Sequence, residues 1–352
     1  MTTVAQSNPT ILATAVVPWN ERFEFQEEVF RRQVHILARD LTRDLYVFGT
    51  AGEGYAVTER QFDQITRAFW ESAQESKVNP MVGLISLSLP TIVERIQRCH
   101  ALGYRLFQLS LPSWGALNDR EVDRFFAETC GRFPDCQFHH YNLMRTKRLL
   151  TSVEYRRLAA AHPNLIAVKN STTDPAVIAD LMTMTPRLRF YITEFGYAIA
   201  RKTHELGLLI SLAAINPERA KRFVAGTDAQ RAADLEELKA VIAGLKAAGD
   251  KFHIDGAYDK MLYRMTDPTF PLRLLPPYAS ASDADFEVFK AAIPPHLRAH
   301  TSECTDFSAL NGRRVAILGA GAAAMDASTV ALQQGAARVD LFCRRATLQG
   351  EE

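Results

Sequence analysis

One lysine stands directly behind an apolar run in the stretch NLIAVKNSTTD, residues 164–174. The four apolar residues before Lys169 predict a buried strand that ends at the lysine. If the amine faces the protein interior, the low dielectric lowers its pKa and leaves a neutral nucleophile for a carbonyl carbon. If it lies at the rim, the side chain keeps its charge in water. Position alone leaves both alternatives open.

A glycine-rich stretch, GTAGEG, covers residues 49–54 at the end of another apolar run. Its glycines allow consecutive backbone N–H groups to converge on an anion. The stretch lacks the Lys-Ser pair of a phosphate-binding loop, so a plain glycine-rich turn is the alternative.

A third polar segment, HHYN, closes the apolar run at residues 136–142. Tyr141 either takes part in chemistry or packs its ring with the hydroxyl in water. His139 and His140 are adjacent, so their side chains face opposite sides of a strand and cannot bind one metal ion together. We interpret both histidines as structural and expect no metal.

The elements that must position these groups follow a repeat. Short runs rich in Val, Ile, Leu and Phe alternate with longer segments of helical spacing, which is typical of βα units. Thr58 has the residue type and setting of a helix N-cap, and Gly103 those of a C-cap. The eight predicted strands are residues 11–17, 45–49, 81–85, 105–110, 136–142, 165–169, 189–193 and 208–212. Uniform spacing favours a closed TIM (β/α)8 barrel over an open doubly wound sheet, because nothing indicates a switch point.

The organisation changes beyond this repeat. We predict a (β/α)8 barrel at residues 1–225, appended helices at 226–300, a polar linker at 301–312 and a partial dinucleotide-binding-like βαβ unit at 313–352. In a TIM barrel the carboxyl ends of the strands carry the active site, so the three polar segments are predicted to meet there.

The composition excludes several classes of function. The 41 Lys and Arg and 40 Asp and Glu residues are spread along the chain, so we expect no nucleic-acid or membrane partner. No apolar run reaches the roughly 18 residues of a membrane span, and the N-terminus lacks a targeting pattern. The five cysteines show no CxxC spacing, which indicates reduced thiols and a cytoplasmic protein. Small-molecule chemistry is the remaining expectation.

GTAGEG at the second predicted strand, YN at the fifth and LIAVKNS at the sixth resemble the motifs of the dihydrodipicolinate synthase / N-acetylneuraminate lyase family of pyruvate-type class I aldolases. The resemblance covers about residues 10–300. It implies that Lys169 forms an imine with the keto carbon of pyruvate or another 2-keto acid, and that Tyr141 transfers protons. It also implies that the GTAGEG loop holds the carboxylate, that the imine needs no further cofactor, and that the protein is a homotetramer.

The same resemblance implies further site residues. Thr50 would act in catalysis by bridging to Tyr141. Thr193 and Glu194 replace a glycine-aspartate pair and would contact substrate hydroxyls. The complete set of implied substrate-binding residues is Gly49, Ala51, Gly52, Glu53, Arg145, Thr193, Glu194 and Ile210.

Departures from the family pattern restrict the reaction. Ala51 stands where a second hydroxyl residue is common, so one donor to the carboxylate is missing. Ser113 and Trp114 stand where the synthase subgroup has relay tyrosines. A proline is absent before Arg145, which lies one step nearer to the tyrosine and would bind a distal carboxylate. Lysine biosynthesis is therefore disfavoured, and another aldehyde or a sugar acid is the predicted partner.

The C-terminal stretch RRVAILGAGAAAMDAS resembles the NADPH-binding segment of flavin-dependent monooxygenase-type oxidoreductases. GAGAAA follows a predicted strand and opens a predicted helix, so Gly319 and Gly321 would bind a dinucleotide, and Arg344 would suit a 2′-phosphate. One βαβ unit exposes both sheet edges and covers one face, so we expect a remnant that does not bind NADP.

The leading interpretation is a Schiff-base lyase, an aldolase or dehydratase that acts on a 2-keto acid. A catalytically degenerate barrel that only binds keto acids and an NADP-linked oxidoreductase fragment are the alternatives. Loss of the relay tyrosine favours the degenerate barrel, whereas retention of Lys169, Tyr141 and Thr50 favours an enzyme. The choice among cleavage, condensation and dehydration is left open.

Overall fold

The computed structural model describes residues 10–185, 187–249 and 255–294, and within the tail residues 312, 314–318, 328–329, 331–333 and 335–342. The chain divides into two compact units, Met1–Ala292 and Ile293–Glu352. The barrel and the helices that follow it belong to the first unit.

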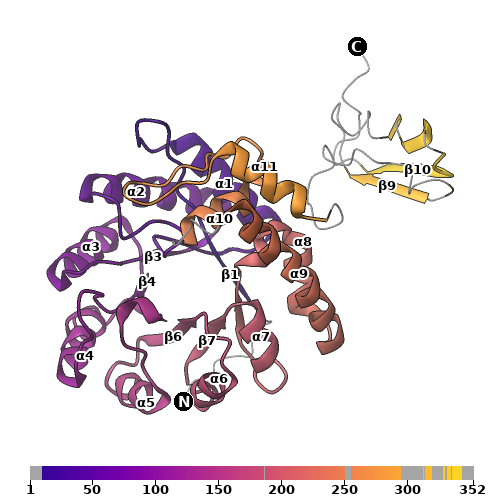
Figure 1. The fold of residues 1–352 in the computed structure, drawn as a ribbon. Helices are drawn as coiled ribbons and strands as arrows, with labels where there is room; N and C mark the ends of the chain where they lie inside the picture. Colours follow the sequence, from indigo (N-terminus) through magenta and orange to yellow (C-terminus); the bar gives the residue numbers. More distant parts are fainter. Residues whose placement is uncertain are drawn as a thin grey trace. The chain divides into compact units, whose positions relative to one another are not determined.

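The first unit contains a closed barrel of eight parallel strands in chain order (Figure 1). The strands are β1 (Ile11–Thr14), β2 (Asp44–Val47), β3 (Asn79–Gly83), β4 (Leu106–Leu109), β5 (Gln137–Asn142), β6 (Leu165–Asn170), β7 (Arg189–Ile192) and β8 (Gly207–Leu209). Strand β8 closes the barrel by pairing with β1, with Ile11 opposite Leu208. The predicted TIM barrel is confirmed.

Helices surround the strands, as Figure 1 shows. Those within the repeat are α1 (Glu27–Asp40), α2 (Glu59–Ser76), α3 (Leu89–Leu102), α4 (Asp119–Phe126), α5 (Ser152–Ala161), α6 (Pro175–Met182), α7 (Glu194–Ala200) and α8 (Pro217–Ala225). The helices after the repeat are α9 (Asp228–Ala248), α10 (Asp255–Arg264) and α11 (Asp283–Ala292). Among the described residues, no helix is both long enough and apolar enough to cross a membrane.

Two predicted helix ends are confirmed. Thr58 caps α2 by accepting a hydrogen bond from the Gln61 N–H, and the Gln61 side chain accepts from the Thr58 N–H in return. Gly103 ends α3 in the left-handed conformation, and a Cβ there would lie 2.5 Å from the Trp70 ring. Glycine is therefore required at that position.

Several strands end earlier than the apolar runs that predicted them. Strand β2 ends at Val47 because Phe48 takes a left-handed conformation, with φ of 64°. Strand β8 has only three residues, so Ile210 lies just beyond it. Most apolar residues just past the strand ends are buried, among them Val17, Phe48 and Leu84, which explains why hydrophobicity alone extended the predicted strands.

A layer of inward-facing residues fills the barrel. Its members form one buried cluster, namely Leu12, Tyr46, Met81, Ala167, Tyr191 and Leu209. A Cβ on Gly207 would lie 2.4 Å from the Tyr191 ring, so the missing side chain leaves room for that ring. Lys169 follows Ala167 by two residues on β6, and therefore faces inward one level closer to the carboxyl end.

The second unit contains a two-stranded parallel sheet of β9 (Arg314–Leu318) and β10 (Arg338–Phe342). The parallel pairing agrees with the predicted βαβ unit, and residues 328–329 and 331–333 between the strands are helical. The predicted nucleotide-binding residues Gly319, Gly321 and Arg344 lie outside the described residues. Residues 301–311 of the predicted linker lie outside them as well.

Candidate active site

Lys169 lies inside the barrel mouth, with only 2% of its surface exposed. Its Nζ donates a hydrogen bond to the Tyr46 Oη at 2.8 Å. The same nitrogen lies 4.1 Å from the centroid of the Tyr46 ring and 3.9 Å from that of the Tyr141 ring. The alternative of a rim lysine with its charge in water is therefore wrong.

Tyr141 reaches the amine because β5 and β6 are neighbours in the barrel. Tyr141 pairs with Lys169 in the parallel register, and residues paired in this way face the same side of a sheet. Its side chain is buried, which excludes the alternative of a hydroxyl turned to bulk water at the rim. The Tyr141 ring thus lies beside the amine, and proton transfer by its hydroxyl stays a prediction.

Tyr46 is a site residue that the sequence interpretation missed. It lies on β2 and belongs to the inward-facing cluster, three residues before the GTAGEG loop. One signal in the sequence could have indicated it. Tyr46 lies in the strand that leads into that loop, and side chains of a strand alternate between the two faces, so every second residue faces the barrel interior. A tyrosine in an otherwise apolar strand gave no reason to prefer chemistry over packing.

The GTAGEG loop begins beside the amine. A Cβ on Gly49 would lie 3.4 Å from the Lys169 Nζ and 2.5 Å from the Tyr46 ring, so the backbone approaches both side chains closely. A Cβ on Gly52 would lie 2.8 Å from the Phe48 nitrogen, and that position also requires glycine. Thr50 and Ala51 are buried between the two glycines. A bridge from Thr50 to Tyr141 stays a prediction.

Glu53 anchors the GTAGEG loop through hydrogen bonds to residues of other segments. Its side chain is fully buried, and its Oε1 accepts from Trp19 Nε1 at 2.9 Å and from Lys260 Nζ at 2.6 Å. Its Oε2 accepts from the Leu275 N–H at 2.7 Å. Both carboxylate oxygens accept hydrogen bonds from protein donors, so the Glu53 side chain supports the loop. Contact of Glu53 with substrate stays a prediction.

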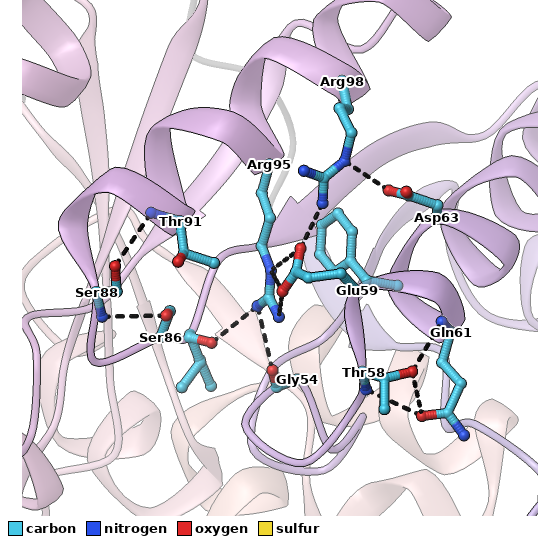
Figure 2. A network of polar contacts seen from close by, with 12 residues as sticks. Gly54, Thr58, Glu59, Gln61, Asp63, Ser86, Ser88, Thr91, Arg95 and Arg98 are labelled. Carbon is cyan, nitrogen blue, oxygen red and sulfur yellow. Dashed lines mark hydrogen bonds and ion pairs between the residues drawn. The ribbon is translucent and has the colours of Figure 1, made fainter.

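Arg95 holds the other end of the loop, as Figure 2 shows. Its guanidinium donates to the Gly54 carbonyl at 3.4 Å and to the Ile85 carbonyl at 3.0 Å, and it pairs with Glu59 at 2.7 Å. Burial alone would raise the pKa of Glu59, but hydrogen bonds from Arg95 and Arg98 outweigh it and bring the pKa below its usual range. The loop is thus tied to α2 and α3.

Glu194 and Ile210 lie at the seventh and eighth strand ends. Glu194 is buried, and its Oε1 accepts from the backbone N–H groups of Ser211 at 2.7 Å and Ala213 at 3.0 Å. Burial raises the pKa of Glu194 above its usual range, although these N–H groups oppose the shift. The Ile210 N–H donates to the Leu12 carbonyl at 3.1 Å. One oxygen of Glu194 is therefore engaged in the fold, and contact with substrate hydroxyls stays a prediction.

The two remaining predicted contacts differ in exposure. Thr193 is half-buried at the N-cap of α7, where its side chain makes no capping hydrogen bond. Arg145 is exposed in a short 3-10 turn, Met144–Thr146. Binding of a distal carboxylate by Arg145 stays a prediction.

The two histidines of β5 face opposite sides, as predicted. The His139 ring stacks on Tyr191 inside the barrel at 5.5 Å, whereas His140 Nδ1 lies 2.6 Å from the Tyr155 hydroxyl. Burial, aided by the positive charge of Arg189, lowers the pKa of His139 to about 3, and burial lowers that of His140 to about 3. Both rings are therefore neutral near pH 7.

One group of side chains has the spacing of metal ligands. His100, Asp135 and Cys136 place their ligand atoms within 4.8 Å of one another. Asp135 already accepts from His100 at 2.7 Å and pairs with Arg105 at 3.3 Å. Burial raises the pKa of the Cys136 thiol to about 11, which disfavours the thiolate that a metal needs. These residues lie at the amino end of β5, away from Lys169.

Comparison with protein families matches residues 8–256 to the dihydrodipicolinate synthetase family. The 4-hydroxy-tetrahydrodipicolinate synthase of Exiguobacterium sibiricum is 24% identical over 177 residues, which cover 50% of this chain and 59% of that protein. An FAD-dependent urate hydroxylase of Xanthomonas campestris is 53% identical over 57 residues, 16% of this chain and 12% of that protein. The chain thus spans less than two thirds of either relative, and so short a match to the hydroxylase carries no activity over.

Solved structures with the same fold cover most of the chain. A prophage protein of E. coli K12 from the dihydrodipicolinic acid synthase family, solved in complex with pyruvate, has a TM-score of 0.70 at 13% identity and covers 80% of this chain and 96% of its own. The sialic acid aldolase of Ruminococcus gnavus has a TM-score of 0.69 at 14% identity and covers 81% and 95%. At these identities the likeness shows the shared barrel.

Proposed function

Since the chain belongs to the dihydrodipicolinate synthetase family, we propose that it is a class I lyase in which Lys169 forms an imine with pyruvate or a related 2-keto acid. One observation carries this proposal. The Lys169 amine is buried at the carboxyl end of β6, 2.8 Å from one tyrosine hydroxyl and 3.9 Å from the ring of a second tyrosine. A buried amine beside phenols is the arrangement that carbonyl addition followed by proton transfer requires.

The proposed reaction begins when the neutral Lys169 amine attacks the keto carbon. The carbonyl oxygen takes up a proton from the attacking nitrogen to give a carbinolamine, and a second proton from Tyr141 lets that oxygen leave as water. The resulting C=N bond withdraws electrons from the neighbouring carbon, so a bond at that carbon can break or form. The substrate carboxylate would accept hydrogen bonds from backbone N–H groups of the GTAGEG loop, which starts beside the amine.

The second substrate is proposed to differ from that of lysine biosynthesis. Trp114 is 82% exposed at the carboxyl face and offers no hydroxyl, and Ser113 beside it is no phenol. A tyrosine relay from this loop is therefore unavailable, which supports another aldehyde or a sugar acid as the partner. Thr193, Glu194 and Arg145 are the proposed contacts to that partner.

We also propose that the protein is a cytoplasmic homotetramer and that the tail does not bind NADP. The five cysteines without CxxC spacing support a cytoplasmic location, and the family resemblance supports a homotetramer. The second rests on β9 and β10, the strands among the described residues of the tail, because one βαβ unit covers only one face of its sheet.

Imine trapping tests the proposed function. Borohydride added with pyruvate should inactivate the protein, and peptide mapping should place the reduced adduct on Lys169. Lys169→Ala and Lys169→Arg should abolish both adduct and turnover, because neither leaves a neutral amine in place. Lys147→Ala is the control, since Lys147 is an exposed lysine that bonds the Trp114 carbonyl at 2.8 Å. An adduct on another lysine, or turnover by Lys169→Ala, would overturn the proposal.

A barrel that binds keto acids without turnover is the second candidate. Ala51 in place of a hydroxyl residue is the observation that favours it, because one donor to the carboxylate is lost. Such a protein would form the Lys169 adduct but would not exchange the methyl protons of pyruvate with D2O. Exchange followed by NMR therefore separates the two candidates without knowledge of the second substrate.

A further inference from the structure

Glu53 and Lys260 form an ion pair in which both side chains are fully buried. Their Nζ and Oε1 atoms lie 2.6 Å apart, although 207 positions separate the residues in sequence. Glu53 belongs to the GTAGEG loop, and Lys260 lies on α10, after the barrel. The family match ends at residue 256, so Lys260 lies beyond the matched segment.

Helix α10 and the segment after it cover the loop closely. A Cβ on Gly256 would lie 3.5 Å from the Ala51 carbonyl oxygen and 3.7 Å from the Glu53 Cγ. Lys260 also donates to the Arg273 carbonyl, and Leu275 donates its N–H to Glu53. The loop therefore takes its position partly from residues outside the (β/α)8 repeat.

The negative charge of Glu53 affects the proposed binding of a substrate carboxylate by the GTAGEG loop. A loop that holds a substrate carboxylate carries a carboxylate of its own, and two like charges repel strongly where water is excluded. A buried charge is also costly unless an opposite charge pairs with it. Burial lowers the pKa of Lys260, but the Glu53 carboxylate opposes that shift and favours the ammonium form. The Lys260 ammonium thus cancels the negative charge of Glu53, and the ion pair as a whole is neutral.

We propose that Lys260 is a positioning residue for the anion-binding loop, because its ammonium neutralises Glu53 and so allows the GTAGEG loop to hold the carboxylate of a 2-keto acid. This inference rests on the proposed function. It predicts an effect on keto-acid affinity that is separate from the chemistry at Lys169, since Lys260 donates its hydrogen bonds to Glu53 and to the Arg273 carbonyl.

The test measures borohydride trapping of pyruvate at pH 8 as a function of pyruvate concentration. In Lys260→Met the half-saturating pyruvate concentration should rise about tenfold or more. The reason is that the unpaired Glu53 carboxylate repels the bound anion, and at the dielectric of a protein surface this repulsion costs at least about 1.4 kcal/mol. The trapping rate at saturating pyruvate should stay within about twofold of the original, because Lys169 and its tyrosines are unchanged.

Two further variants separate charge from packing. Glu53→Gln should raise the half-saturating concentration much less than Lys260→Met does, because it removes the repelling charge while the amide oxygen can still accept a hydrogen bond. The double variant Glu53→Gln/Lys260→Met should recover to within about threefold of the original protein, since no unpaired charge remains. Arg219→Met is the matched control, because it breaks another largely buried pair, at 3.1 Å to Asp234, that joins α8 to α9.

Each outcome bears on a distinct statement. If the unaltered protein forms no adduct, the proposed function fails and this inference fails with it. If it forms the adduct and Lys260→Met has the same half-saturating concentration, only the inference is overturned. A tenfold rise in Glu53→Gln, or no recovery in the double variant, would also overturn it, because packing alone would explain both. These two variants decide the question if Lys260→Met does not fold.

Discussion

Replacing Tyr46 by phenylalanine tests whether its hydroxyl orients the amine of Lys169. The change keeps the ring that packs against Gly49 and removes the oxygen that accepts a hydrogen bond from Nζ at 2.8 Å. A hydrogen bond of this kind, made in a buried site by a group that can carry charge, contributes about 1.5–3 kcal/mol. Since about 1.4 kcal/mol corresponds to a factor of ten, imine formation should slow by about 10- to 100-fold.

The assay is the rate of borohydride trapping at saturating pyruvate, followed by mass spectrometry of the intact protein. The half-saturating pyruvate concentration should not change, because the loop that holds the carboxylate is intact. Tyr191→Phe is the control: its hydroxyl is also inside the barrel, but it accepts from Thr10 at 3.3 Å, at the opposite end. That variant should keep its trapping rate within about twofold.

Two results would refute this reasoning. Trapping by Tyr46→Phe at the rate of the unaltered protein would show that the hydroxyl does not orient the amine. An equal loss in Tyr191→Phe would show that any hydroxyl removed from the barrel interior disturbs the site, so the effect could not be assigned to the bond between Tyr46 and Lys169.

Three other predictions follow from the same structure. Tyr141→Phe should keep imine trapping but slow proton exchange at the pyruvate methyl by about 100- to 10,000-fold, the usual share of a general acid or base, and normal exchange measured by NMR would assign Tyr141 to packing. Deletion of residues 307–352 should leave trapping intact, and calorimetry should show only weak NADPH binding by the whole chain; micromolar affinity would contradict this. Glu59→Gln should lower the Tm most above the ordinary pKa range of a glutamate and progressively less as the pH falls below that range. A carboxyl whose folded pKa is depressed stabilises the protein above its unfolded pKa and loses that contribution as the pH falls through the folded value. A Tm difference that does not vary with pH would contradict the role of its arginine pairs.

Local pattern was sufficient for the barrel and for part of the site. Eight apolar runs at even spacing predicted eight strands, because a strand buried on both faces needs an apolar run whatever lies elsewhere in the chain. Thr58 and Gly103 were predicted as helix ends because capping involves residues only a few positions apart. Lys169 was predicted at a strand end because a single charged residue behind four apolar ones marks the edge of a buried segment.

Only the tertiary structure decided which groups meet that lysine and what holds the loop beside it. Tyr46 and Lys169 are 123 positions apart, and Glu53 and Lys260 are 207 apart, so no local periodicity links them. Barrel closure brings the first pair together, and the packing of α10 against the loop brings the second. The residue types are set by the sequence. The direction of the Tyr46 side chain into the barrel and the pairing of Glu53 with Lys260 depend on contacts between distant segments, which form only when the whole core is buried.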